Sequence, residues 1–208
     1  MDQQQQIVTT QAEVTKLYGE ASDAVQRKVI DHLDTHCRAF IERSPFVLVA
    51  TSGTGGCDVS PRGGPAGFCE VVDDRTLVIA DAAGNKRLDT VRNVVESGRV
   101  GLLFLIPGIR ETLRINGGAH LTRDPQVLER NATGGKTPVA AIVIDVEEAF
   151  LHCAKAFIRS QLWQPEAWPS TEGLASAAQI WRDHILVPEW SAGAVQAMLD
   201  DDYANNLY

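Results

Sequence analysis

The hydrophobic positions in the first 44 residues follow a helical spacing. Residues 1–20 are polar and weakly patterned, which predicts a short helix or an arm. From Ser22 onward, apolar residues recur at steps of three and four, which predicts an amphipathic helix with a buried stripe. The members of this stripe are Val25, Val29, Leu33, Cys37, Phe40 and Ile41. Ser44-Pro45 ends the helix, because a residue that precedes proline disfavours helical backbone angles.

The middle of the chain changes to patterns typical of β-strands. Short apolar or alternating runs occupy residues 46–51, 57–62, 68–72, 76–80, 100–106, 111–117 and 139–146. Turn residues separate several of these runs at hairpin spacing. Short helices are expected at residues 88–95 and 125–130. Strands linked by hairpins, with few long helices between them, predict a mainly β fold, an antiparallel barrel with flanking helices.

Helical patterns return after residue 150. A helix is expected up to Trp163, and residues 164–208 contain two more, together with the acidic run Asp200-Asp201-Asp202. We therefore expect one domain over residues 1–208. Its N-terminal helical segment spans about residues 1–44 and its C-terminal helical extension about residues 164–208.

Composition and charge exclude several classes of partner. The chain has 208 residues, is 44% hydrophobic and carries a formal net charge of −8, which argues against nucleic acid and anionic membranes as partners. Its four cysteines are scattered, so we expect neither a disulfide framework nor a metal site. The first residues lack the pattern of a signal peptide, and no apolar run has membrane-spanning length. A cytoplasmic protein is the expectation.

Candidate chemistry begins on the strand predicted at residues 57–62. Strand alternation places Asp58, Ser60 and Arg62 on one face, opposite Val59. The glycine-rich residues 63–67 follow, where a flat ring can approach the backbone closely. The alternative is an ordinary strand whose polar side faces water.

A second candidate is the helix start at Gly84-Asn85-Lys86-Arg87. Unpaired amide groups at a helix N-terminus bind phosphate, and the two cations add charge-assisted hydrogen bonds. The alternative is a solvated helix start with two surface cations.

Two weaker candidates lie further along the chain. Thr112 and Arg114 share the polar face of an alternating strand, which is a solvent face in the alternative interpretation. Lys155 and Arg159 lie four residues apart on a helix, where like charges repel unless an anion lies between them. Cys153 is expected to pack as a small core residue. None of the common hydrolase, zinc or nucleotide motifs is present, and no catalytic residue is identified.

Taken together, these segments resemble the FMN-binding split barrels of the pyridoxamine 5′-phosphate oxidase-like family. The resemblance covers about residues 46–163 and rests on residues 58–63, 84–89, 100–108, 111–117 and 153–163 in this order. It implies an antiparallel split β-barrel of the FMN-binding type and a homodimer with FMN at the subunit interface. The contacts that it implies for FMN are Asp58, Val59, Ser60, Arg62, Asn85, Lys86, Arg87, Thr112, Arg114, Lys155, Arg159 and Ser160.

The resemblance also implies a function. We expect an FMN-dependent oxidoreductase that acts on a small molecule by hydride transfer at flavin N5. True pyridoxamine phosphate oxidases end in a basic tail near Arg-Leu-x-Pro, whereas this sequence ends in an acidic one, so a different substrate is expected. The alternatives are a flavin-binding or flavin-sequestering module without turnover, and the same barrel with a deazaflavin; haem ranks last.

Overall fold

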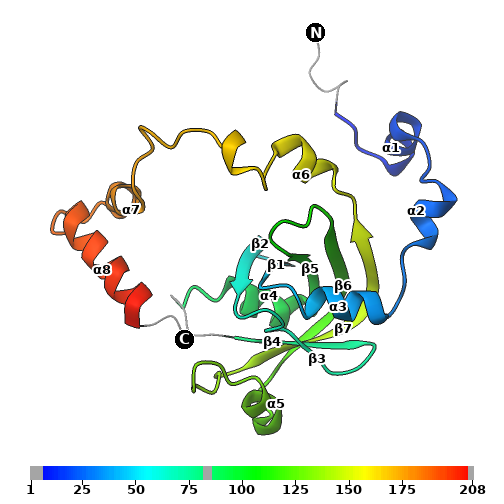
Figure 1. The fold of residues 1–208 in the computed structure, drawn as a ribbon, viewed down its shortest axis with the longest axis horizontal. Helices are drawn as coiled ribbons and strands as arrows, with labels where there is room; N and C mark the ends of the chain where they lie inside the picture. Colours follow the sequence, from blue (N-terminus) through cyan, green and yellow to red (C-terminus); the bar gives the residue numbers. More distant parts are fainter. Residues whose placement is uncertain (1–6, 82–85, 206–208) are drawn as a thin grey trace.

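The computed structural model describes residues 7–81 and 86–205, and its centre is a seven-stranded antiparallel sheet (Figure 1). The strand order is β2-β1-β5-β6-β7-β4-β3, so the sheet is open and β2 and β3 form its two ends. The strands are β1 (Phe46–Gly53), β2 (Gly56–Gly63), β3 (Glu70–Val71), β4 (Thr76–Ala80), β5 (Arg99–Leu105), β6 (Thr112–Thr122) and β7 (Ala141–His152). The prediction of a mainly β, antiparallel fold is confirmed.

Short helices surround this sheet. Within the described ranges they are α1 (Gln11–Tyr18), α2 (Asp23–Arg27), α3 (Thr35–Ile41), α4 (Asp89–Ser97), α5 (Pro125–Arg130), α6 (Lys155–Ser160), α7 (Ala177–Ile185) and α8 (Ala192–Asn205), with a 3-10 turn at Pro165–Ala167. None of these helices is long and apolar enough to cross a bilayer.

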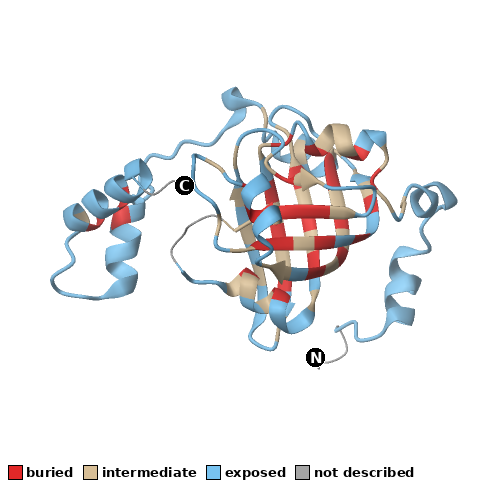
Figure 2. Cartoon of the chain, turned by 90° about the horizontal axis from the view of Figure 1, so that it is seen from below, coloured by how far each residue is buried: buried red, intermediate tan, exposed pale blue. Residues whose placement is uncertain are grey.

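Burial alternates along β1 and β5, and Figure 2 shows the resulting bands across the sheet. On β1, Val47 and Val49 are fully buried, and on β4 so is Leu77. These residues belong to one core cluster, although β1 and β4 are separated by three strands in the sheet. The sheet therefore curls around one main core and brings its two ends toward one another, while Val78 of β4 packs in a smaller cluster with Leu128 and Ala141.

The N-terminal region departs from the prediction of one continuous helix. Helix α2 ends at Arg27, and α3 begins only at Thr35. Between them, Ile30 pairs with Ala149 of β7 through two backbone hydrogen bonds of 3.0 and 2.7 Å. The predicted stripe is therefore divided: Val25 lies in α2 and the last three members lie in α3, because the backbone of Ile30 bonds to the sheet instead of to a helical turn.

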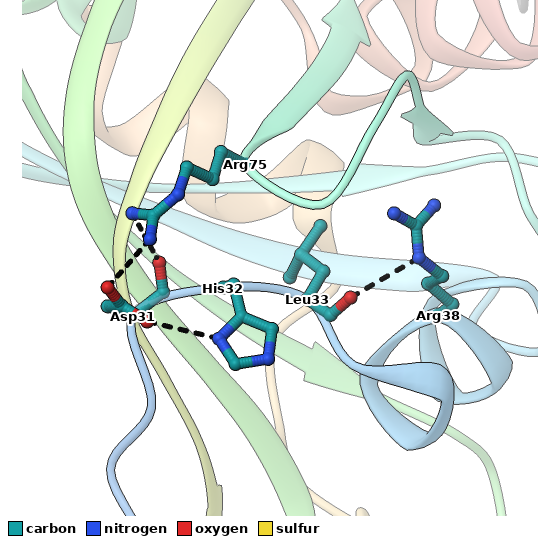
Figure 3. A network of polar contacts seen from close by, with 5 residues as sticks. All are labelled: Asp31, His32, Leu33, Arg38 and Arg75. Atoms are coloured by element: carbon teal, nitrogen blue, oxygen red, sulfur yellow. Dashed lines mark hydrogen bonds and ion pairs between the residues drawn. The ribbon is translucent and has the colours of Figure 1, made fainter.

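Polar contacts fasten this segment to the turn before β4 (Figure 3). Arg75 donates to the carboxylate of Asp31 over 2.7 Å and to its carbonyl oxygen over 3.0 Å. The His32 ring lies 3.0 Å from the same carboxylate, and Arg38 donates to the carbonyl of Leu33 over 3.2 Å. Arg75 is the largest cause that lowers the pKa of Asp31 to about 2.

The C-terminal helices α7 and α8 stand apart from the sheet in both views (Figures 1 and 2). They pack on each other through a small core of their own, Ala178, Val195 and Leu199. The two helices expected after residue 164 are thus present, and they form a hairpin beside the barrel. Cys153, expected in the core, is exposed instead, because it follows β7 where the chain leaves the sheet.

Candidate functional site

The polar side of β2 faces the core side of the sheet. Arg62 and Ser60 lie opposite the fully buried Val47 and Val49 of β1 in the strand register. Val59, which points the other way, is 61% exposed. The interpretation of Asp58, Ser60 and Arg62 as a water-facing strand side is therefore wrong: this edge strand turns its polar side inward.

Helix α4 covers the hairpin end of this inner face and closes a hydrogen-bond network there. Thr90, in its first turn and 2% exposed, donates to Oδ2 of Asp58 over 2.7 Å. Ser60 donates to the same oxygen over 2.8 Å. The Thr90 hydroxyl also lies within hydrogen-bond distance of the Ser60 hydroxyl, at 2.9 Å, so its single proton has two acceptors within reach, Asp58 and Ser60. Asp58 is thus held as a fixed acceptor.

Arg62 lies further along β2, where it approaches Asp81, the residue that follows β4. One guanidinium nitrogen lies 3.4 Å from the Asp81 carboxylate, and the two side chains are 26% and 16% exposed. The Nε atom of Arg62 is buried and has no hydrogen-bond partner among the described residues. Burial raises the pKa of Asp81, and the charge of Arg62 opposes this rise. We call Asp58, Ser60, Arg62, Asp81 and Thr90 the inner-face cluster.

The segment before α4 has an unusual backbone and carries two cations. Lys86 and Leu88 adopt left-handed angles, with φ of 60° and 63°, which side chains with a Cβ rarely take. Leu88 provides no side-chain cap for the helix, and Arg87 pairs with Asp89 in the first turn. Such backbone outliers cluster at ligand sites. The predicted contributions of Gly84 and Asn85 lie outside the described residues.

Three other predicted residues lie on the opposite face of the sheet. Val59 faces outward from β2, and Thr112 and Arg114 share the outer side of β6. The Arg114 guanidinium lies over the Phe150 ring at 5.8 Å, and Thr112 is only 3% exposed. Within one chain, the structure therefore divides the predicted site between two faces.

Lys155, Arg159 and Ser160 lie on α6, which follows β7 and has no buried residue. All three are exposed, and the Ser160 hydroxyl donates to the carbonyl of Phe157 over 3.4 Å. The structure does not bring them into the inner-face cluster.

Two members of the cluster were missed by sequence reasoning. Thr90 directly follows the segment 84–89 on which the family resemblance rests, but nothing in its spacing shows that it faces Asp58. Asp81 follows an apolar strand and looks like a turn residue. An acidic residue directly after a buried strand is the one signal that could have drawn attention to it.

The inner face suits a ligand with anionic oxygens. Arg62 offers an unsatisfied buried donor, and Lys86 and Arg87 add cations at the start of α4. Three carboxylates, those of Asp58, Asp81 and Asp89, balance these charges, and each already lies near a hydroxyl or a cation. A flavin phosphate fits this donor set by replacing existing charge pairs rather than by entering a bare basic pocket.

The residues described include no group of His, Cys, Asp and Glu side chains that could hold a metal ion. A shallow depression of about 570 Å³ lies elsewhere on the sheet, between β5, β6 and β7, and is lined by Arg99, Asn116, Glu147 and Glu148 among others. There Arg99 donates to both oxygens of Glu147, over 2.5 and 2.7 Å, so its polar groups satisfy each other. The depression offers no unpaired donor comparable to Arg62.

Several solved structures are similar to this chain. The HupZ protein of Group A Streptococcus is 18% identical; the match covers 57% of this chain and 92% of that one, with a TM-score of 0.47. An FMN-binding protein from Syntrophomonas wolfei subsp. wolfei is 15% identical, with coverages of 56% and 83% and a TM-score of 0.44. A NimC/NimA family protein from Clostridium acetobutylicum is 12% identical, with coverages of 56% and 91% and a TM-score of 0.41. No curated protein matches.

The comparison with family models is decisive. The model described as pyridoxamine 5′-phosphate oxidase matches residues 33–153. This range holds all seven strands of the sheet, helix α4 and the whole inner-face cluster. Because the match covers more than half of the chain, the protein belongs to the pyridoxamine 5′-phosphate oxidase family.

Proposed function

We propose that this protein binds FMN and uses it as an oxidoreductase on a small molecule. The observation that carries the proposal is the buried, unpartnered Nε of Arg62, which lies on the same face as Asp58 and Ser60 of the family-matched strand. A buried donor without an acceptor is costly, so such a group in a native fold suggests a ligand. The family assignment makes a flavin the leading candidate for that ligand.

Each part of the inner face has a role in this proposal. Lys86 and Arg87 hold the phosphate at the start of α4, where helix amides and the helix dipole favour an anion, and Arg62 donates to the same phosphate from β2. Asp58, fixed by Ser60 and Thr90, accepts hydrogen bonds from the ribityl chain or the ring. FMN, when bound, supplies hydride transfer at N5. The protein then orients the ring and excludes water. These two tasks do not require an acid–base pair among the protein's side chains.

The remaining predicted contacts fit a homodimer. The outer faces of β2 and β1 carry half-exposed or exposed apolar residues, among them Val59, Leu48 and Ala50 in neighbouring positions. A second copy packed on this face covers them and brings its own Thr112, Arg114 and α6 toward the flavin edge. We propose this dimer as the complete site, with the barrel of residues 46–163 as its unit.

None of the four cysteines is disulfide-bonded, which favours the cytoplasm.

The visible spectrum of the purified protein tests the proposal. Absorbance bands of oxidised flavin, together with FMN released by denaturation, are expected. A colourless protein that does not take up added FMN contradicts the proposal, and a deazaflavin spectrum identifies the alternative ligand. Anaerobic reduction by NADH or NADPH, followed by reoxidation with candidate acceptors, then separates an oxidoreductase from a module that only stores flavin.

Light scattering coupled to size exclusion tests the dimer. The wild-type chain is expected at twice its monomer mass of 22.6 kDa. Val59→Asp places a charge on the outer face and is expected to give monomers that retain the fold but bind FMN weakly. A monomeric wild type with full FMN affinity contradicts the interface proposal.

A further inference from the structure

Arg62 and Asp81 connect the two ends of the curled sheet. Arg62 belongs to β2, one end strand, whereas Asp81 directly follows β4, which lies beside the other end strand. The backbone of Asp81 donates to the carbonyl of Ala140 over 3.0 Å, which keeps it beside the start of β7. Their ion pair therefore crosses the opening of the split barrel. We call this contact the seam pair.

The seam pair is a poor bond for Arg62. Its 3.4 Å separation exceeds the roughly 2.7–2.9 Å of charge-assisted hydrogen bonds. The pair between Arg75 and Asp31 reaches 2.7 Å and includes a hydrogen bond, although both groups are far more exposed. Arg62 is thus attracted by Asp81 but makes no hydrogen bond to it, and its Nε has no partner within residues 7–81 and 86–205.

The Asp81 carboxylate is also in an unfavourable position. Its side chain is 16% exposed, and burial is the largest cause of its raised pKa, which the charge of Arg62 does not overcome. Burying a charged pair is unfavourable unless its geometry is excellent. Both partners of the seam pair would gain from a change: Arg62 from a better acceptor, and Asp81 from access to water.

From this geometry we propose that Asp81 is a positioning residue that competes with the anionic oxygens of the flavin ligand for Arg62. It holds the arginine across the seam in the free chain and releases it when the ligand binds. The proposal rests on the proposed flavin function. Because only chains with a released Arg62 are competent for the anion, the apparent affinity is lowered by the competent fraction. Asp81 thereby sets how strongly the site prefers phosphorylated flavin.

The experiment compares FMN with riboflavin, which has the same ring but no phosphate. Dissociation constants are measured by quenching of flavin fluorescence for the wild type, Asp81→Asn and Asp81→Glu. We expect Asp81→Asn to bind FMN about tenfold more tightly, while its riboflavin affinity changes by less than about twofold. Asp81→Glu retains the negative charge, so we expect it to bind FMN no more tightly than the wild type does.

Asp145→Asn is the matched control. It removes the same charge from β7, opposite Thr76 at the far end of β4, and its side chain is 68% exposed. We expect it to leave both affinities unchanged, whereas a tightening equal to that of Asp81→Asn would show a general charge effect and overturn the proposal. Should Asp81→Asn fail to fold, Asp81→Ser takes its place with the same expectation.

The outcomes distinguish the two levels of the argument. A wild type that binds FMN, with an Asp81→Asn variant that binds it equally or more weakly, overturns the role of Asp81 and leaves the proposed function intact. A simultaneous tightening of FMN and riboflavin also overturns it, because a merely structural change does not discriminate by phosphate. If neither wild type nor variant binds flavin, the proposed function fails and the role of Asp81 falls with it.

Discussion

Replacing Thr90 by valine tests whether the inner-face cluster is a stabilising network as well as a ligand site. Valine keeps the shape of threonine but lacks its hydroxyl, so Asp58 loses one of its two hydroxyl donors. Thr90 is 2% exposed, and water cannot easily replace the lost hydrogen bond. The change therefore removes the one hydroxyl through which Thr90 of α4 reaches Asp58 and Ser60 of β2.

The expected cost follows from the charge of the acceptor. A hydrogen bond to an ionised group contributes about 1.5–3 kcal/mol. Asp58 is half-buried and keeps the Ser60 bond, so we expect the lower part of this range, about 1.5–2 kcal/mol. For a chain of this length the loss corresponds to a fall in the melting temperature of roughly 3–8 °C.

Urea unfolding of the flavin-free protein, followed by circular dichroism, measures this loss. Thr51→Val is the control, because the buried Thr51 hydroxyl accepts only a neutral amide bond from Asn93, over 3.1 Å. That bond contributes about 0.5–1.5 kcal/mol. The reasoning is refuted if Thr90→Val stays within about 0.5 kcal/mol of the wild type, or if Thr51→Val costs as much.

Two further predictions concern the sheet and its N-terminal anchor. In Gly117→Ala, the new methyl group would overlap the carbonyl oxygen of Asp145, so we expect the free energy of unfolding in urea to fall by about 3 kcal/mol or more. The control is Gly118→Ala, whose new methyl group would have its nearest neighbour at 3.8 Å and should cost far less. Equal losses for the two variants would contradict this prediction. The lowered pKa of Asp31, about 2, means that its contribution to stability is present above pH 4 and is lost as the pH falls toward 2. The difference in melting temperature between wild type and Asp31→Asn should therefore vanish between pH 4 and 2, and a constant difference would refute the anchor.

The local pattern of the chain was sufficient for much of the fold. Alternation and turn residues located the strands, and the antiparallel sheet confirms the fold class that they predicted. The pattern failed between residues 28 and 34. A helical spacing of apolar residues there concealed the backbone pairing of Ile30 with Ala149, a partner more than a hundred residues away. Spacing reports which side of a segment is apolar, but not which distant segment satisfies its backbone.

The candidate site shows the same division. The sequence by itself identified Asp58, Ser60 and Arg62 as one face of a strand, because strand geometry fixes alternation wherever the strand lies. It could not say that this face points inward, since that depends on which side of the sheet holds the core. Nor could it pair Arg62 with Asp81: the curl of the sheet alone brings β2 and the end of β4 together. The local backbone determined which residues share a face of the strand, and tertiary packing decided what that face contacts.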